Sequence, residues 1–356
     1  MSNIIGLERK AIALCTFCLI LMFVSYFPAN YAHDSVNYLV MFEYASQSSF
    51  VELLENYNFA NESLFNLILY FSSMLFDFKL TLFFITYLSL VLKMLIIAKI
   101  DNSITAIYLY CISFMVVFDS ATVRIGLATT IALLGALYFF KKKYSWGVFF
   151  FLISSQIQAT TIIFIPIVFF LIFFKQYKFI NFAFLASPIS LLFKINLVDY
   201  LIEISSKFNN KFINYYQNTD ELASLDLNSI LLITFFYSLI LYTNIRFYHY
   251  KTGVPLQKII QFNYLNAVCQ FGVIAFFVFH YNLTIAQRIS FLLIIPLIFN
   301  LSTVFRCNFK CNRNVENITI SILLIVFSVF KFVGLFYFDT LDLDEENQFF
   351  KLVGFY

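Results

Sequence analysis

The chain has 356 residues, of which 61% are hydrophobic and only 12% are charged, with 50 phenylalanines and 23 tyrosines. A soluble domain usually carries about twice that charged fraction, so this composition excludes a soluble globular protein and predicts apolar surface that faces lipid. The formal net charge of +3 gives no basic footprint, and we expect no nucleic-acid partner.

The first apolar run, roughly residues 11–27, follows Arg9 and Lys10. It lacks a small-x-small cleavage site and many apolar runs follow it, so we predict a retained membrane helix instead of a cleaved signal peptide. Residues 28–62 contain five acidic residues and neither lysine nor arginine, which places this loop outside the cytoplasm by the positive-inside rule. Apolar residues at helical spacing over 36–54 predict one or two short amphipathic helices within it.

The rest of the chain alternates apolar runs with short polar breaks. The further runs cover residues 63–78, 80–98, 104–118, 124–140, 146–157, 159–174, 179–193, 229–245, 262–279, 288–305 and 318–338. Several are shorter than the roughly 17 residues that a simple membrane span needs. We predict an all-α, polytopic transmembrane helical bundle of about 11–12 membrane segments, forming a single integral membrane domain over residues 1–356.

The basic breaks at 175–178, 246–258 and 306–313 are predicted to be cytoplasmic, and the Asn-rich insert 194–228 is predicted to be an external loop with a functional role. Between Glu62 and Arg124 this topology requires an even number of crossings. Three apolar runs lie there, so we expect one of them to be a half-span or an interfacial helix.

Two arginines stand out near the predicted outer surface. Arg124 opens an uncharged apolar run that Lys141–Lys143 close, and Arg288 opens a second one. If the three lysines are cytoplasmic, Arg124 lies at the opposite surface, where a guanidinium is costly unless it meets water or an anion. Two permanent cations on one side predict a phosphate or diphosphate site. The alternative is interfacial snorkelling of each side chain.

Asp34 and Glu62 are the candidate general base and its partner, because both lie in the predicted outer loop. Each also fits an ordinary structural role, Asp34 as a helix cap and Glu62 in the first turn of a helix.

Tyr38, Gln158 and His280 are candidate sugar-binding residues on the same face. Hydrogen bonding between helices is the alternative for Gln158, and a solvated loop position is the alternative for His280. No Gly-rich phosphate loop, zinc-type helix motif or serine elbow is present in the sequence, so we expect neither a metal nor a cofactor.

Four segments together resemble the EpsG-like branch of the Wzy-type polysaccharide polymerases. They are HDSVNYLVMFEY, ESLFNLILYFSSMLF, VRIGLATTIALLGALYFFKKK and AQRISFLLIIPLI. The chain departs from the family pattern in SSQIQATTIIFIP, where Gln158 stands in place of the usual His and Thr160 in place of the usual Ser. The resemblance therefore gives no acid or base role to position 158.

The resemblance implies a multi-pass protein of the bacterial inner membrane, with an architecture like that of the GT-C membrane glycosyltransferases. Its substrate would be an undecaprenyl-diphosphate-linked oligosaccharide, and its product would be an O-antigen, a capsule or an exopolysaccharide. Its partners would be membrane lipid and a Wzz-like chain-length regulator. Arg124 and Arg288 would hold the diphosphate, and Asp34 or Glu62 would activate the acceptor hydroxyl. A lipid-linked glycan flippase or transporter and a glycan ligase are the competing functions.

Overall fold

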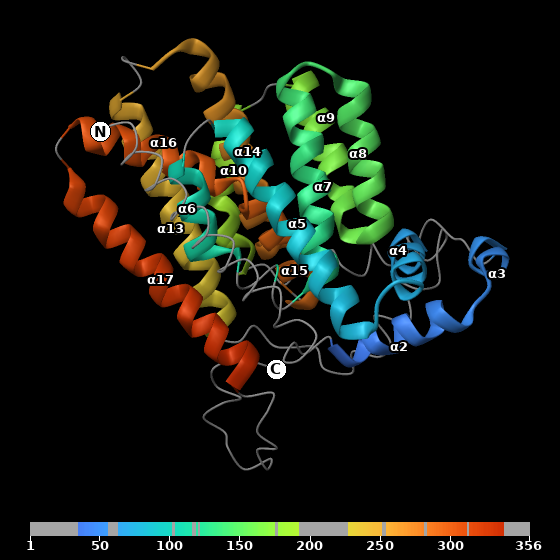
Figure 1. The fold of residues 1–356 in the computed structure, drawn as a ribbon. Coiled ribbons are helices and arrows are strands. Elements are labelled where there is room, and N and C mark those ends of the chain that lie inside the picture. Colours follow the sequence, from blue (N-terminus) through green and yellow to red (C-terminus); the bar gives the residue numbers. More distant parts are fainter. Residues whose placement is uncertain are drawn as a thin grey trace, which may run out of the picture. The chain divides into compact units, whose positions relative to one another are not determined.

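A computed structural model of the chain describes residues 35–55, 63–101, 104–115, 119, 122–174, 177–191, 227–250, 254–280, 283–311 and 313–337. Every regular element within these ranges is a helix (Figure 1), which confirms the predicted all-α class. The chain divides into two compact units, Met1–Ala159 with Ile320–Asp342, and Thr160–Thr319 with Leu343–Tyr356. The predicted residues Asp34 and Glu62, the first apolar run and residues 194–226 of the predicted insert lie outside the described residues.

The described helices of the first unit are α2 (Ser35–Gln47), α3 (Phe50–Glu55), α4 (Ser63–Ser73), α5 (Phe78–Asp101), α6 (Ile104–Ser113), α7 (Val123–Phe140) and α8 (Tyr144–Ile157). Those of the second unit are η3 (Ala159–Ile163), whose first residue belongs to the first unit, and α9 (Phe164–Phe174), α10 (Tyr177–Ala186), η4 (Ser187–Leu191), α13 (Leu227–Tyr250), α14 (Leu256–Val278), α15 (Leu283–Ile294) and α16 (Leu297–Lys310). Helix α17 (Asn314–Tyr337) begins in the second unit and continues in the first.

Helix α5 exposes a stripe of apolar side chains, whereas several of its polar side chains are buried. Its outward stripe is 37% to 57% exposed and consists of Leu80, Phe84, Leu88, Leu92 and Leu95. Its buried face includes Thr81, Ser89 and Lys93. Such a distribution stabilises a helix in lipid and would be costly in water.

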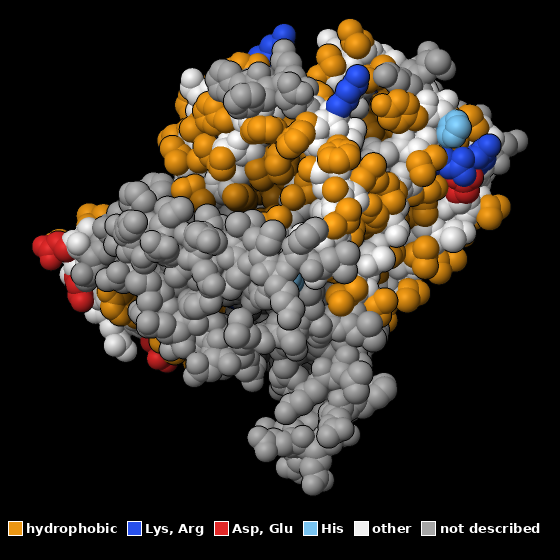
Figure 2. All heavy atoms as spheres, turned by 180° about the vertical axis from the view of Figure 1, so that it is seen from behind, with side chains coloured by type: hydrophobic (Ala, Val, Ile, Leu, Met, Phe, Trp, Pro, Cys, Tyr) orange, Lys and Arg blue, Asp and Glu red, His pale blue; other side chains and the backbone are white. Residues whose placement is uncertain are grey.

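Within the described residues, five helices are long and apolar enough to cross a membrane. They are Phe78–Asp101, Val123–Phe140, Ile230–Tyr250, Leu256–Val278 and Ala286–Phe309, the last of which combines parts of α15 and α16. Figure 2 shows hydrophobic side chains spread widely over the described surface. The chain is therefore a membrane protein.

The predicted amphipathic segment 36–54 forms two short helices, α2 and α3, as expected. Between positions 62 and 124, α4 has 11 residues and α6 has 10, whereas α5 has 24. A helix of 10 or 11 residues is about half the length that a crossing requires. Two of the three runs therefore have the length of the predicted half-span.

Two predicted runs are interrupted. The run 288–305 is divided between α15 and α16, with Pro296 as the residue before α16. The run 179–193 forms α10 for only 10 residues and then tightens into the 3-10 helix η4, which contains Pro188. Proline lacks a backbone N–H and clashes with the preceding turn, so an interruption beside each proline has a direct physical cause.

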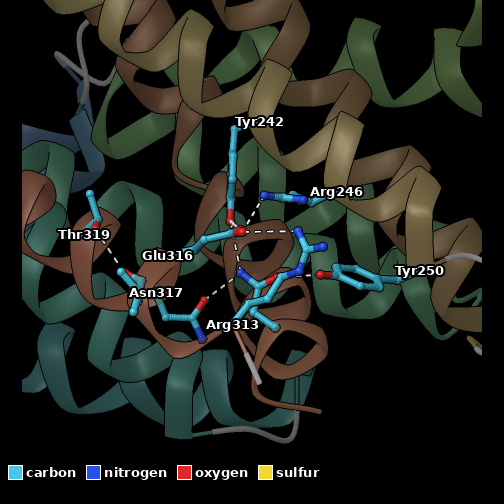
Figure 3. A network of polar contacts seen from close by, with 9 residues as sticks. Tyr242, Arg246, Tyr250, Arg313, Glu316, Asn317 and Thr319 are labelled. Carbon is cyan, nitrogen blue, oxygen red and sulfur yellow. Dashed lines mark hydrogen bonds and ion pairs between the residues drawn. The ribbon is translucent and has the colours of Figure 1, made fainter. Parts of the chain in front are cut away.

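The polar end of the second unit is held by a network around Glu316 (Figure 3). Its carboxylate accepts hydrogen bonds from Arg246 at 2.5 Å and from the Tyr242 hydroxyl at 2.9 Å. Arg313 adds a contact of 3.3 Å. Asn308 in turn donates to Tyr242 at 3.0 Å. These bonds tie together the ends of α13, α16 and α17, at the end of the unit that the sequence assigns to the cytoplasm.

Candidate functional site

Arg124 lies in the first turn of α7, on a fully buried tyrosine. Its guanidinium carbon is 5.6 Å from the ring centroid of Tyr38, a cation–π distance. The backbone N–H of Arg124 points to the Tyr38 hydroxyl oxygen at 3.5 Å. The ring of Tyr38 also packs at 6.0 Å from that of Phe65 on α4. The Tyr38 ring and hydroxyl thus both contact Arg124. Because the Tyr38 side chain is 0% exposed, neither face of its ring is open to a sugar.

The electrostatics at this end of α7 favour an anion. The first backbone N–H groups of a helix lack intrahelical acceptors, and the helix dipole places partial positive charge there. The half-buried guanidinium of Arg124 adds a full positive charge to the same end. The guanidinium and the positive end of the helix dipole repel each other, and a bound phosphate would offset this repulsion because its negative charge attracts both.

The α7–α8 hairpin fixes the position of Arg124 relative to Gln158. Lys142, with φ of 58°, lies in the turn that joins the two helices. The helices approach closely enough that a Cβ on Gly147 would fall 2.2 Å from the Phe139 ring. The Ser154 hydroxyl donates to the Ala128 carbonyl at 2.8 Å. The hairpin therefore has the lysine turn at one end and both Arg124 and Gln158 at the other.

Gln158 caps α8 in an extended conformation, and its backbone N–H donates to the Ser154 carbonyl at 3.0 Å. Its side chain is buried. The preceding residue, Ile157, belongs to the same hydrophobic cluster as Tyr38 and Val123. Three sequence-predicted residues, Tyr38, Arg124 and Gln158, thus lie in or directly beside one cluster of the first unit.

The carboxylates Asp34 and Glu62 directly precede this cluster in the chain. Asp34 is followed by α2, which carries Tyr38, and Glu62 is followed by α4, which carries Phe65. Helices α2 and α4 pack against each other. Both residues lie outside the described ranges, so their roles stay predictions.

Arg288 and His280 belong to the second unit. They share the hairpin of α14 and α15, whose close packing is marked by a 2.6 Å bond from the Ser290 hydroxyl to the Gly272 carbonyl. Arg288 is half-buried in α15. His280 follows α14 with its Nδ1 at 2.6 Å from the Phe277 carbonyl oxygen and only 6% of its surface exposed. The solvated position considered for His280 is therefore wrong.

Sequence reasoning missed a buried charged cluster in the first unit. Lys93 forms an ion pair with Asp119, and the two side chains are 0% and 1% exposed. The Tyr110 hydroxyl accepts from Lys93 at 3.0 Å and donates to Asp119 at 2.6 Å. The sequence does indicate such a cluster, because Lys93 is the single charged residue within the apolar run 80–98. A lysine inside a membrane segment needs a polar or charged partner.

Comparison with known proteins gave one finding. The model of the EpsG family matches residues 11–352, nearly the whole chain. No curated protein and no solved structure matches the chain.

Proposed function

The chain belongs to the EpsG family, and we propose that it polymerises undecaprenyl-diphosphate-linked oligosaccharide repeat units into a surface polysaccharide at the outer face of the bacterial inner membrane. It would act as a glycosyltransferase. The observation that carries this proposal is the Arg124 guanidinium, seated on buried Tyr38 at the positive end of α7. That arrangement suits a phosphate-bearing substrate in a protein surrounded by lipid.

The reaction joins two lipid-linked glycans. A hydroxyl oxygen of the acceptor unit attacks the anomeric carbon of the growing glycan, and the bond from that carbon to the undecaprenyl diphosphate breaks. The acceptor proton passes to a carboxylate base, for which Asp34 and Glu62 are the candidates. The diphosphate leaves with one more negative charge than it had as an ester. A fixed guanidinium lowers the barrier by stabilising that developing charge.

We assign different roles to the other predicted residues. Tyr38 is a positioning residue, because its ring and hydroxyl contact Arg124. Gln158 is the candidate sugar contact of the first unit. Arg288 and His280 are candidate contacts to the diphosphate and the sugar from the second unit. A chain-length regulator is proposed as the protein partner.

The test is a glycan gel of a deletion strain. We expect single capped repeat units in the deletion and a full ladder after complementation with wild type. Polymer retained on carrier lipid would indicate a ligase, and absence of glycan outside the cell would indicate a flippase; either result would overturn the polymerase assignment.

The same strain tests Arg124. Loss of one group that stabilises an oxyanion costs about a hundredfold or more in rate, so Arg124→Ala should abolish the ladder while an immunoblot shows normal protein in the membrane. Arg313→Ala is the matched control, because Arg313 is 49% exposed and forms its ion pair with Glu316 in the second unit. A normal ladder with Arg124→Ala would refute the diphosphate role of this residue.

A further inference from the structure

A pocket lined by both amide and apolar side chains lies between α10, α13 and α14 in the second unit. Its volume is about 280 Å³, near the lower limit for small-molecule sites and large enough for one sugar-sized group. Five side-chain amides line it: Asn181, Asn244, Asn263, Asn266 and Gln270. Such a concentration is unusual in a protein that is 61% hydrophobic, because each amide costs free energy when it leaves water without a partner.

One of these amides lacks a hydrogen bond. Asn266 is 5% exposed, and its Oδ1 has no partner among the described residues. By contrast, the Gln270 amide nitrogen donates to Asn181 Oδ1 at 2.7 Å. An unsatisfied buried acceptor costs about 1–3 kcal/mol. The lining therefore includes a buried amide whose acceptor capacity the described residues do not meet.

The lining specifies the chemistry of that molecule. Amides donate and accept hydrogen bonds, as hydroxyl groups do, so they match a hydroxyl-rich ligand. Among the described residues, no carboxylate lines the pocket, and the one charged lining residue is the exposed Lys178. Phe247 and Phe262 supply an apolar wall, with rings stacked at 3.6 Å and 4°. Lys178 would repel a cationic ligand. A neutral polyol, or a polyol that carries a phosphate group near Lys178, fits the lining.

The pocket belongs to the second unit, whereas Arg124 belongs to the first. It lies toward the start of α10 and the end of α13, next to the basic breaks 175–178 and 246–258 that the sequence assigns to the cytoplasm. His280 follows the opposite end of α14. The pocket thus lies at the inner end of the unit, whereas the proposed polymerisation occurs at the outer face.

We propose that this pocket binds a hydroxyl-rich group of about one sugar ring, with the lining amides, Asn266 among them, exchanging hydrogen bonds with ligand hydroxyls. Two sources carry that chemistry: a soluble saccharide, and the polyol headgroup of a membrane lipid. Binding at this site is independent of the polymerase assignment.

The experiment has two arms on the purified full-length protein. In the first, equilibrium binding of radiolabelled glucose, galactose and N-acetylglucosamine is measured in detergent. In the second, retention of phosphatidylglycerol over phosphatidylcholine is measured by native mass spectrometry after release from nanodiscs. Saturable binding of one probe to the wild type in either arm is expected, and the responding arm identifies the source.

Asn266→Leu should weaken that binding at least about tenfold, the equivalent of one lost hydrogen bond. Asn300→Leu is the matched control, because Asn300 is 1% exposed, also has buried amide atoms without partners among the described residues, and does not line the pocket. The control should bind as the wild type does. Failure of every probe to bind, as expected of a pocket that holds only water, or equal binding by Asn266→Leu, would overturn the proposal.

Discussion

The two units each contain a lysine or arginine paired with a carboxylate, in very different surroundings. In the first unit, Lys93 and Asp119 are 0% and 1% exposed. In the second, Arg246 and Glu316 are 23% and 27% exposed and belong to a wider polar network. A buried pair gains little net free energy over apolar residues, yet losing one partner is very costly, whereas a pair near solvent contributes little either way.

The difference indicates what each pair does. Asp119 lies five residues before Arg124, and its bond to Lys93 ties that part of the chain to α5. Such a pair fixes Asp119, which is close in the sequence to the first turn of α7. The Glu316 network joins α13 to the start of α17, and α13 also packs against α16.

The largest effect is expected for Lys93→Met. It leaves the Asp119 carboxylate buried with the Tyr110 hydroxyl, at a cost of about 3–5 kcal/mol. The thermal unfolding midpoint in detergent should fall strongly, whereas exposed Lys99→Met on the same helix should change little. The double variant Lys93→Met/Asp119→Leu should recover most of the loss. A double variant as unstable as Lys93→Met would contradict this account of the pair.

An intermediate effect is expected for Tyr110→Phe. The substitution keeps the ring and the ion pair but removes the hydroxyl that bonds both charged groups. The loss should be about 1–3 kcal/mol, measured by the same unfolding experiment. A cost equal to that of Lys93→Met would mean that the hydroxyl, and not the ion pair, dominates the cluster.

The smallest effect is expected for Glu316→Gln. The amide oxygen can still accept from Tyr242, while the charge opposite Arg246 is lost, so we expect a loss of about 1 kcal/mol or less. Salt should reduce the difference from the wild type, because ions screen charges near solvent. The comparison between the units would fail if this variant unfolded as readily as Lys93→Met, or if its effect did not depend on salt.

The sequence predicts the helices well because the period and length of the apolar runs determine them. It also predicts the α7–α8 hairpin, since Lys141–Lys143 mark a polar turn between two apolar runs. Helix lengths are less predictable: α10 ends after 10 residues, although its apolar run continues to residue 193.

Side-chain pairing was the part that could not be predicted. Lys93 is conspicuous in its run, but its partner Asp119 is 26 positions away, and only the folded helices bring them together. The support of Arg124 by Tyr38, 86 positions apart, is likewise a tertiary contact. The sequence predicts Tyr38 as a sugar contact from its place in the outer loop, whereas in the structure its side chain is buried and its ring lies against Arg124.

The proposed binding of the diphosphate by Arg124 is tested most directly with purified protein in liposomes that contain a synthetic undecaprenyl-diphosphate-linked repeat unit. The rate of polymerisation is measured. Our account predicts that Arg124→Ala lowers kcat by about a hundredfold or more with a smaller change in KM, because the charge develops in the transition state. Arg124→Lys should retain part of the rate, since it keeps the charge without the bidentate geometry. An Arg124→Ala protein that is folded and polymerises at the wild-type rate would contradict the central claim.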